Sequence, residues 1–228
     1  MEINMSEELL TIIEKGVLQL GIWETVYMTF ISTVIAYIIG LPLGVILTVT
    51  GKEGIRPLPC FNKVLGFIVN IFRSIPFIVL LVAMLPVAKL IVGKSYGNAA
   101  MIVMLVIAAA PYVARMVESS VKVVDSGVIE AAQSMGTSTF KIIYKVLIPE
   151  AKPSLIVGAV ISTVTILSYS AMASTIAGGG LGAIAIVWGH QRSNPDITWI
   201  CVILIVIIVQ VIQELGMKIA SKIDKRIK

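Results

Sequence analysis

Five long apolar stretches, separated by shorter polar segments, run along this chain of 228 residues. The hydrocarbon core of a bilayer is about 30 Å thick and needs roughly 20 residues of helix to cross it, and each stretch is long enough. Glu214, near the end of the last stretch, is the only acidic residue within them. The pattern therefore predicts an all-α membrane protein with five transmembrane helices. The predicted spans are residues 25–50, 64–92, 98–117, 155–177 and 197–217.

Prolines interrupt three of these spans, and two glycines flank the first of these prolines, but no change of composition marks a second domain. We therefore expect residues 1–228 to form one membrane domain. Helix breakers are tolerated in a bilayer where neighbouring helices satisfy the freed carbonyl groups, so we expect kinks that serve either packing or gating. The breakers are Gly40, Pro42 and Gly44 in the first span, Pro76 and Pro86 in the second, and Pro111 in the third.

The composition excludes an ordinary soluble protein. Hydrophobic residues make up 57% of the chain and charged residues 14%, whereas about a quarter of the residues of a soluble protein are charged. Residues 1–24 hold five acidic side chains and one lysine, which is the reverse of a signal peptide and favours a short amphipathic helix on the membrane surface. Cys60 is predicted to lie in a cytoplasmic loop and Cys201 near the outer end of the fifth span. They would be a membrane thickness apart, so no disulfide between them is expected.

The basic residues cluster in alternate loops. Thirteen of the 18 Lys and Arg residues lie in the first loop, at or within the third loop, and in the tail. The positive-inside rule then places the N-terminus outside and the C-terminus in the cytoplasm, as an odd number of spans requires. This clustering accounts for the net charge of +5, so we expect contact with membrane lipid and no nucleic-acid partner. The thirteen are Lys52, Arg56, Lys63, Arg115, Lys122, Lys141, Lys145, Lys152, Lys218, Lys222, Lys225, Arg226 and Lys228.

The longest polar interruption, residues 118–154, is predicted to be a cytoplasmic loop with two short helices. The first covers residues 128–135, and Gly136 suits its C-terminus, where the left-handed conformation costs glycine little. Thr137 or Ser138 can cap the second helix.

The second short helix is expected to end at Pro149, and Pro153 is expected to begin the fourth span. Its apolar residues recur at i, i+3, i+4 and i+7, which predicts one buried face. That face consists of Phe140, Ile143, Tyr144 and Leu147.

A spaced motif lies across these helices. Glu130-Ala131-Ala132 is followed after three residues by Gly136, and after nine more by Val146-Leu147-Ile148-Pro149. This arrangement, before the penultimate span, resembles the EAA loop by which the membrane subunits of ABC importers engage their ATPases. The resemblance implies that Glu130, Ala131, Ala132, Gly136 and Pro149 couple the chain to an ATPase. The alternative is a passive amphipathic helix on the membrane face.

The chain has no GxxxxGK[ST] phosphate-binding sequence, so it is not expected to hydrolyse ATP itself. We expect it to be a translocating subunit and not an enzyme, with no cofactor of its own and with ATP and Mg bound to a separate ATPase. His190, the only histidine, has no second His or Cys near it in the sequence, so no metal site is expected.

The whole chain is similar to the permease subunits of methionine ABC importers, although residues 189–195 depart from that pattern. The resemblance implies a homodimer of permeases, two ATP-binding subunits and an extracytoplasmic substrate-binding (lipo)protein, which together import methionine, L and possibly D. Two alternatives remain, a permease for another amino acid or small polar solute and an ion-coupled secondary carrier. The matching stretches are residues 23–25, 72–77, 109–115, 170–173 and 178–182.

Candidate residues for the pathway come from the second and fourth spans. Arg73 is a basic residue deep in a span, where a charge costs at least about 2.5 kcal/mol. It either serves the pathway, caps carbonyl groups freed by Pro76, or pairs with a group at the subunit interface. Ser162, Thr165 and Tyr169 follow each other at helical spacing and form either a packing face or a translocation lining. The glycine-rich segment 178–182 is expected to be an outer turn or a flexible outer gate.

Overall fold

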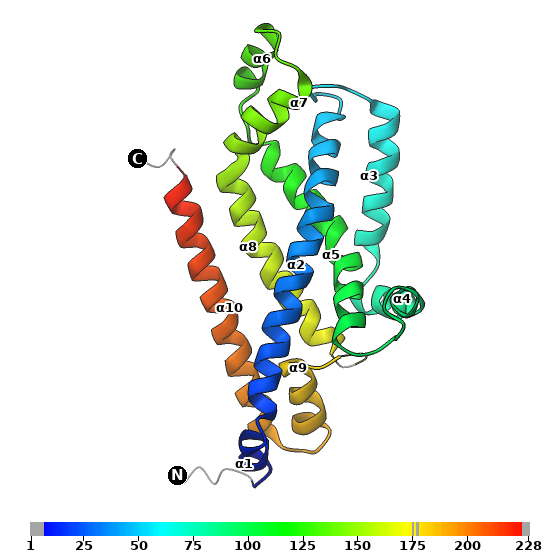
Figure 1. The fold of residues 1–228 in the computed structure, drawn as a ribbon, viewed down its shortest axis with the longest axis vertical. Helices are drawn as coiled ribbons and strands as arrows, with labels where there is room; N and C mark the ends of the chain where they lie inside the picture. Colours follow the sequence, from blue (N-terminus) through cyan, green and yellow to red (C-terminus); the bar gives the residue numbers. More distant parts are fainter. Residues whose placement is uncertain (1–6, 175, 177, 225–228) are drawn as a thin grey trace. The chain divides into compact units, whose positions relative to one another are not determined.

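The computed structural model describes residues 7–174, 176 and 178–224. Every regular element within them is a helix (Figure 1). The elements are α1 (Glu7–Glu14), α2 (Val17–Val49), α3 (Pro59–Ser74), α4 (Phe77–Val92), α5 (Asn98–Val121), α6 (Ser126–Ser134), α7 (Thr139–Ile142), the π-helix η1 (Ile143–Leu147), α8 (Ile148–Ala173), α9 (Leu181–Ile184), the π-helix η2 (Ala185–His190) and α10 (Pro195–Ile223).

The chain packs as two compact units. Unit 1 consists of Met1–Val34, Pro76–Ile107 and Thr163–Ile212, and unit 2 consists of Ile35–Ile75, Ala108–Ser162 and Gln213–Lys228. The helices α2, α5, α8 and α10 each contribute residues to both units, so neither unit is one continuous stretch of chain. The prediction of a single membrane domain over residues 1–228 stays a prediction.

Four helical segments are long and apolar enough to cross a membrane: α2, α5, the continuous segment Thr139–Ala173, and α10. The predicted span 64–92 is broken instead of straight. Helix α3 ends at Ser74 and α4 begins at Phe77, because Pro76 lacks an amide hydrogen and holds Ile75 in an extended conformation (φ −80°, ψ 127°). The count is therefore four spans, or five if the bent pair α3–α4 is one span.

The fourth span begins earlier than predicted, and Pro149 does not end a helix. Helix α7, η1 and α8 continue into one another, and Pro149 lies in the first turn of α8. In the π-helical turn before it, the amide of Ile148 donates to the carbonyl oxygen of Ile143, five residues earlier. This wider turn relieves the clash that a proline ring makes in a regular α-helix, so the helix continues. The predicted end of this span, residue 177, lies outside the described residues.

Unit 1 has an apolar core that includes residues from α1 and the beginning of α2. Ile12 of α1 and Leu18 of α2 are buried with residues of α9 and α10, which lie beside them in Figure 1. Cys201 is fully buried in this cluster. The core fixes α1 and α9 against α2. Its other members are Leu181, Ile184 and Ile197.

In unit 2, α2 and α5 approach closely at two glycines. A Cβ atom on Gly40 would lie 2.6 Å from a side-chain carbon of Val113, and one on Gly44 would collide with the carbonyl oxygen of Ala114. The GxxxG spacing brings membrane helices close together in this way. Helix α2 runs unbroken past Pro42, and Gly40 and Gly44 pack closely against α5.

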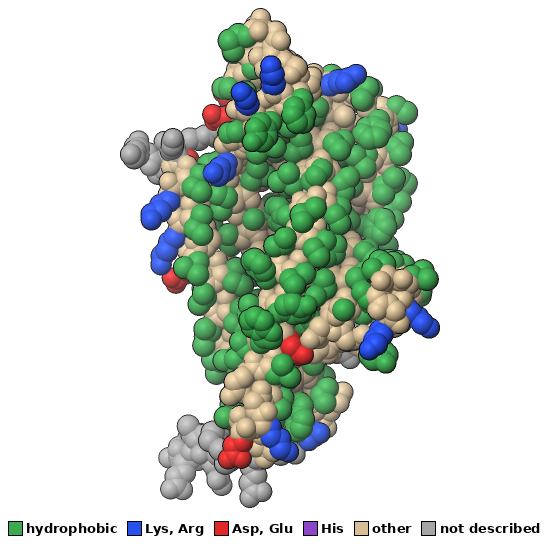
Figure 2. All heavy atoms as spheres, viewed as in Figure 1, with side chains coloured by type: hydrophobic (Ala, Val, Ile, Leu, Met, Phe, Trp, Pro, Cys, Tyr) green, Lys and Arg blue, Asp and Glu red, His purple; other side chains and the backbone are tan. Residues whose placement is uncertain are grey.

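The outward faces of the long helices are apolar. Figure 2 shows hydrophobic side chains along the visible faces of α2 and α10. In the most apolar stretch of α10, only 6% is buried within the chain. A surface of this kind suits lipid tails or a partner subunit. Lys and Arg side chains are visible near α7, on the last part of α10 and on α4.

The orientation is testable by cysteine labelling in a variant that lacks Cys60 and Cys201. With an impermeant maleimide on intact cells, we expect labelling of Ser6→Cys and not of Lys222→Cys, because the basic loops face the cytoplasm. Lys222→Cys should react after permeabilisation. The reverse pattern would contradict the predicted orientation. Lys222 is exposed, whereas Ser6 and the basic residues Lys225, Arg226 and Lys228 lie outside the described residues.

Candidate functional site: the coupling loop and the pathway

Helix α6 presents the residues of the EAA motif. Asp125 caps its N-terminus, and the carboxylate accepts a hydrogen bond from the amide of Gly127 at 2.6 Å. Glu130 and Ala131 are exposed, whereas Ala132 is buried. One face of α6, which includes Ala132, thus packs against the rest of the chain, and the other face, which includes Glu130 and Ala131, is open to a partner.

Gly136 ends α6 in the conformation that the sequence predicts. Its φ is +72°, in the left-handed region. The amide of Gly136 donates to the carbonyl oxygen of Gln133 (2.9 Å), and that of Thr137 donates to the carbonyl oxygen of Ala132 (3.2 Å). This pair of bonds is a Schellman motif, which favours glycine at this position. A Cβ atom here would meet nothing within 4 Å, so the requirement within this chain is conformational.

The predicted apolar face of the second short helix is wrong at Phe140 and Tyr144 and right at Leu147. Phe140 and Tyr144 are 77% and 67% exposed, whereas Ile142 and Leu147 are each 1% exposed. The two buried residues lie five positions apart, because η1 is a π-helix and the period of the helix changes there. Of the two predicted N-cap candidates, Thr137 and Ser138, Ser138 is the N-cap residue of α7. Its side chain makes no capping hydrogen bond.

Four apolar side chains of the loop are therefore exposed: Val128, Met135, Phe140 and Tyr144. Phe140 and Tyr144 directly precede Lys141 and Lys145, which are also exposed. Exposed apolar side chains beside charged residues are typical of protein interfaces.

Glu130 lines a pocket of about 630 Å³. The pocket lies between helix α6 and the turn that follows α2. Lys52 and Glu53 of the turn and Gln133 of α6 also line it. The pocket carries charges of both signs, and the exposed Glu130 carboxylate can accept hydrogen bonds from a partner.

The predicted pathway residues of α8 fall in different surroundings. In unit 2, Ser162 is fully buried, and its hydroxyl lies 3.4 Å from the hydroxyl of Tyr37. In unit 1, the ring of Tyr169 stacks on that of Phe77, with centroids 4.3 Å apart. Thr165 is partly buried. Gly158, one turn before Ser162, has no room for a side chain because a Cβ atom would lie 2.8 Å from Met116.

Arg73 lies in the last turn of α3 and is exposed, at a polar pocket of about 440 Å³ in unit 2. The position suits a cation, since the C-terminal end of a helix carries partial negative charge. The pocket also holds Tyr112, Arg115, Glu118 and Lys122. Whether Arg73, Ser162, Thr165 and Tyr169 line the translocation pathway stays a prediction.

Sequence reasoning missed the ion-pair cluster on α5. Arg115 donates to Glu118 at 2.6 Å, and Lys122 donates to the other oxygen of the same carboxylate at 2.8 Å. Arg115 also donates to the carbonyl oxygen of Gly66 (2.9 Å) and to Asn70 (3.0 Å), which ties α3 to α5. The i, i+3 and i, i+4 spacing of these charges is a signal that would have found the cluster.

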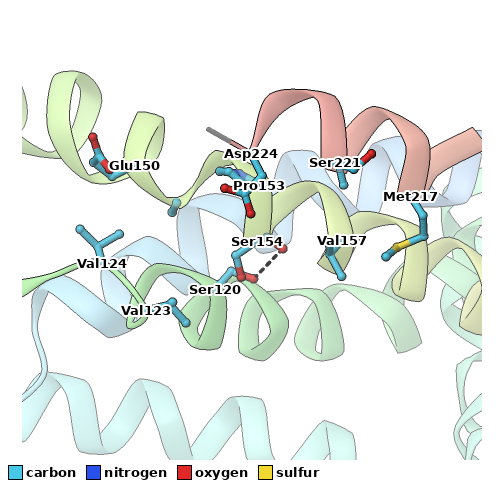
Figure 3. A pocket seen from close by; sticks show the side chains of 12 residues that line it. Ser120, Val123, Val124, Glu150, Pro153, Ser154, Val157, Met217, Ser221 and Asp224 are labelled. Atoms are coloured by element: carbon cyan, nitrogen blue, oxygen red, sulfur yellow. Dashed lines mark hydrogen bonds between the residues drawn. The ribbon is translucent and has the colours of Figure 1, made fainter. Parts of the chain in front are cut away.

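A third pocket, of about 330 Å³, lies between the end of α5, the start of α8 and the end of α10 (Figure 3). The hydroxyl of Ser120 donates to the carbonyl oxygen of Ser154 across it at 3.2 Å. None of the predicted coupling or pathway residues lines this pocket. Among the residues that the structure describes, no group of three or more His, Cys, Asp or Glu side chains could hold a metal ion.

Comparisons with known proteins agree with the motif. Residues 40–228 match the family described as binding-protein-dependent transport system inner membrane component. The chain is 47% identical over 204 residues to the probable D-methionine transport system permease protein MetI of Vibrio cholerae, covering 90% of this chain and 91% of the relative. It is 43% identical over 204 residues to the methionine import system permease protein MetP of Bacillus subtilis, covering 90% and 92%.

A solved structure also resembles the chain over almost its whole length. It belongs to the MetNI methionine ABC transporter in an inward-facing conformation, with a TM-score of 0.91 and 41% identity, and it covers 97% of this chain and 100% of that one. Identity at this level over this length establishes the family. This chain therefore belongs to the binding-protein-dependent transport system inner membrane components, with methionine transport permeases as its relatives, and is a multi-pass protein of the cytoplasmic membrane.

Proposed function

We propose that this chain is the permease subunit of an ATP-driven importer and forms the translocation pathway for methionine. The observation that carries the proposal is the α6 helix with its EAA motif, which ends in a left-handed glycine and leaves Glu130 and Ala131 exposed. The identity to methionine permeases supports the substrate, and the name of the Vibrio cholerae relative favours D-methionine among its forms.

The proposed assembly contains two copies of this chain, two ATPase subunits and an extracytoplasmic substrate-binding protein. Helix α6 and the exposed apolar side chains of the loop fit a groove on the ATPase, because small side chains in the EAA motif allow close approach. Since α7, η1 and α8 form one continuous helix, a movement imposed on the loop is passed directly into a membrane-spanning segment. ATP and Mg²⁺ act on the ATPase subunit, and this chain supplies the pathway and the coupling surface.

The proposal is tested by reconstituting the chain with its ATPase and binding protein in proteoliposomes. We expect uptake of radiolabelled methionine that requires ATP and the binding protein, and that unlabelled D- or L-methionine inhibits. Uptake that is inhibited by another amino acid and not by methionine would reassign the substrate. Uptake that persists without ATP and responds to an ion gradient would show a secondary carrier instead.

A further inference from the structure

The turn before α9, residues 178–180, and the first residue of α9 are held by side chains of α2 and α5. The amide of Gly180 donates to Glu24 Oε2 at 2.8 Å, and that of Leu181 donates to Thr25 Oγ1 at 2.9 Å. The amide of Gly179 donates to Asn98 Oδ1 at 3.2 Å. Three successive backbone amides are thus bound by three side chains from two other helices of unit 1.

Glu24 and Asn98 form one chain of hydrogen bonds with the turn. Asn98 Nδ2 donates to Glu24 Oε1 at 2.8 Å, while Glu24 Oε2 accepts the Gly180 amide. The carboxylate therefore accepts on both oxygens, and Asn98 donates with its nitrogen and accepts with its oxygen. The direction of every bond is fixed, because a backbone amide can only donate and an ionised carboxylate can only accept.

The glycines of the turn allow this close approach. A Cβ atom on Gly179 would collide with the Glu24 carboxylate. Gly180 has φ +95°, which L side chains rarely adopt, and a Cβ atom there would lie 2.8 Å from Thr25 Oγ1. The segment is therefore a closely packed turn and not a loose loop.

The turn also sets the position of the helical segment that follows it. Gly180 is the N-cap of α9, which continues through η2 to His190. Leu181 and Ile184 are buried in the core of unit 1. A carboxylate at the N-terminus of a helix is favourable, so the Glu24 side chain both anchors and caps this segment.

We propose that Glu24 is a positioning residue for the transport cycle. Through Asn98 and the amides of Gly179 and Gly180 it fixes residues 178–190 to α2 and α5, so that these elements move together when the transporter changes state. The inference rests on the proposed function. It predicts that, without these hydrogen bonds, ATP hydrolysis continues while substrate uptake falls, and that the structure of the EAA loop does not change.

The chain of bonds offers a double-variant test. In Glu24→Gln the new amide can accept on one atom only, so one N–H of the set loses its acceptor. In Asn98→Asp two carboxylates face each other. In the double variant Glu24→Gln/Asn98→Asp, the introduced glutamine accepts from the Gly180 amide and donates to the introduced aspartate. The other oxygen of that aspartate accepts from the Gly179 amide, so every bond is restored with the charge moved from one side chain to the other.

In the reconstituted complex we expect each single variant to lower methionine uptake about tenfold, the effect of one lost bond to a charged group, with ATP hydrolysis within about twofold of wild type. Amide hydrogen exchange in residues 179–181 should accelerate by at least about tenfold in the singles. The double variant should recover both uptake and protection. Glu14→Gln, at an exposed carboxylate of α1, is the matched control and should change neither.

Wild-type uptake in Glu24→Gln, or a double variant no better than the worse single variant, would overturn the inference. If a single variant fails to assemble, recovery in the double variant supports the inference, and failure to recover contradicts it. If the wild-type complex imports no methionine, the proposed function fails, whereas the exchange measurements still decide whether Glu24 and Asn98 position the turn.

Discussion

Replacing Gly136 by Asp is expected to reduce ATP-driven uptake by at least about tenfold while the permease stays folded and membrane-inserted. The left-handed backbone at φ +72° costs a residue with a side chain roughly 1 kcal/mol or more. No other part of the chain comes within 4 Å of the added Cβ, so the internal packing is preserved. The larger effect comes from a charge placed on the exposed surface that is proposed to meet the ATPase. Co-purification of the ATPase measures the loss.

Gly136→Asn is the matched control, because Asn has nearly the size of Asp, tolerates the left-handed region similarly and carries no charge. It should retain more ATPase than Gly136→Asp. Glu130→Lys tests the middle of α6, where charge reversal should weaken docking to a basic or donor group, and Glu130→Gln should have a smaller effect. If Gly136→Asp and Glu130→Lys both leave ATPase co-purification and substrate-stimulated hydrolysis at wild-type levels, the loop is a passive surface helix.

Replacing Ser162 by Phe is expected to remove transport together with the assembled complex. Ser162 has no exposed surface, and its hydroxyl lies at 3.4 Å from that of Tyr37 of α2. Overpacking a buried site costs about 1–3 kcal/mol, which is a large share of the stability of a typical protein. Gel filtration of the complex, together with its thermal unfolding, measures the effect.

Ser162→Ala is the control for that substitution. It removes the hydroxyl and leaves the available space unchanged, so the complex should assemble and unfold within a few degrees of wild type. A Ser162→Phe complex that assembles normally but transports nothing would contradict the packing interpretation and place Ser162 in the pathway.

The parts of the structure that could be predicted from the sequence depend on local chemistry. Hydrophobic length predicts helices long enough to span the membrane, and the helix end at Gly136 follows from the freedom of glycine in the left-handed region. Each of these features is decided within a few residues along the chain.

The errors arise where one local rule overrides another. The sequence predicts a helix end at Pro149, but the π-turn before it removes the clash. The same turn buries Ile142 together with Leu147 and leaves Phe140 and Tyr144 exposed. The span 64–92 reads as one apolar run, although Pro76 divides it into α3 and α4. Hydrophobicity gives the length of a segment and does not report its backbone breaks.

Long-range polar contacts could not be predicted at all. Glu24 bonds to Asn98, 74 residues away, and to Gly180, 156 residues away. The individual residues are ordinary for a loop or a helix end, and their partnership depends on how three distant stretches meet. A single sequence contains no signal that predicts contact between these three segments.

The π-turn at Ile143–Leu147 acts as a one-residue insertion at the junction between the coupling loop and a membrane helix. Each residue of an α-helix turns the chain by about 100°. The surplus residue therefore sets the angular phase between α6–α7 on one side and α8 on the other. Shortening this turn by one residue would leave both helices intact and would point the coupling loop about a quarter of a turn away, so the length of this junction specifies the direction in which the loop meets its partner.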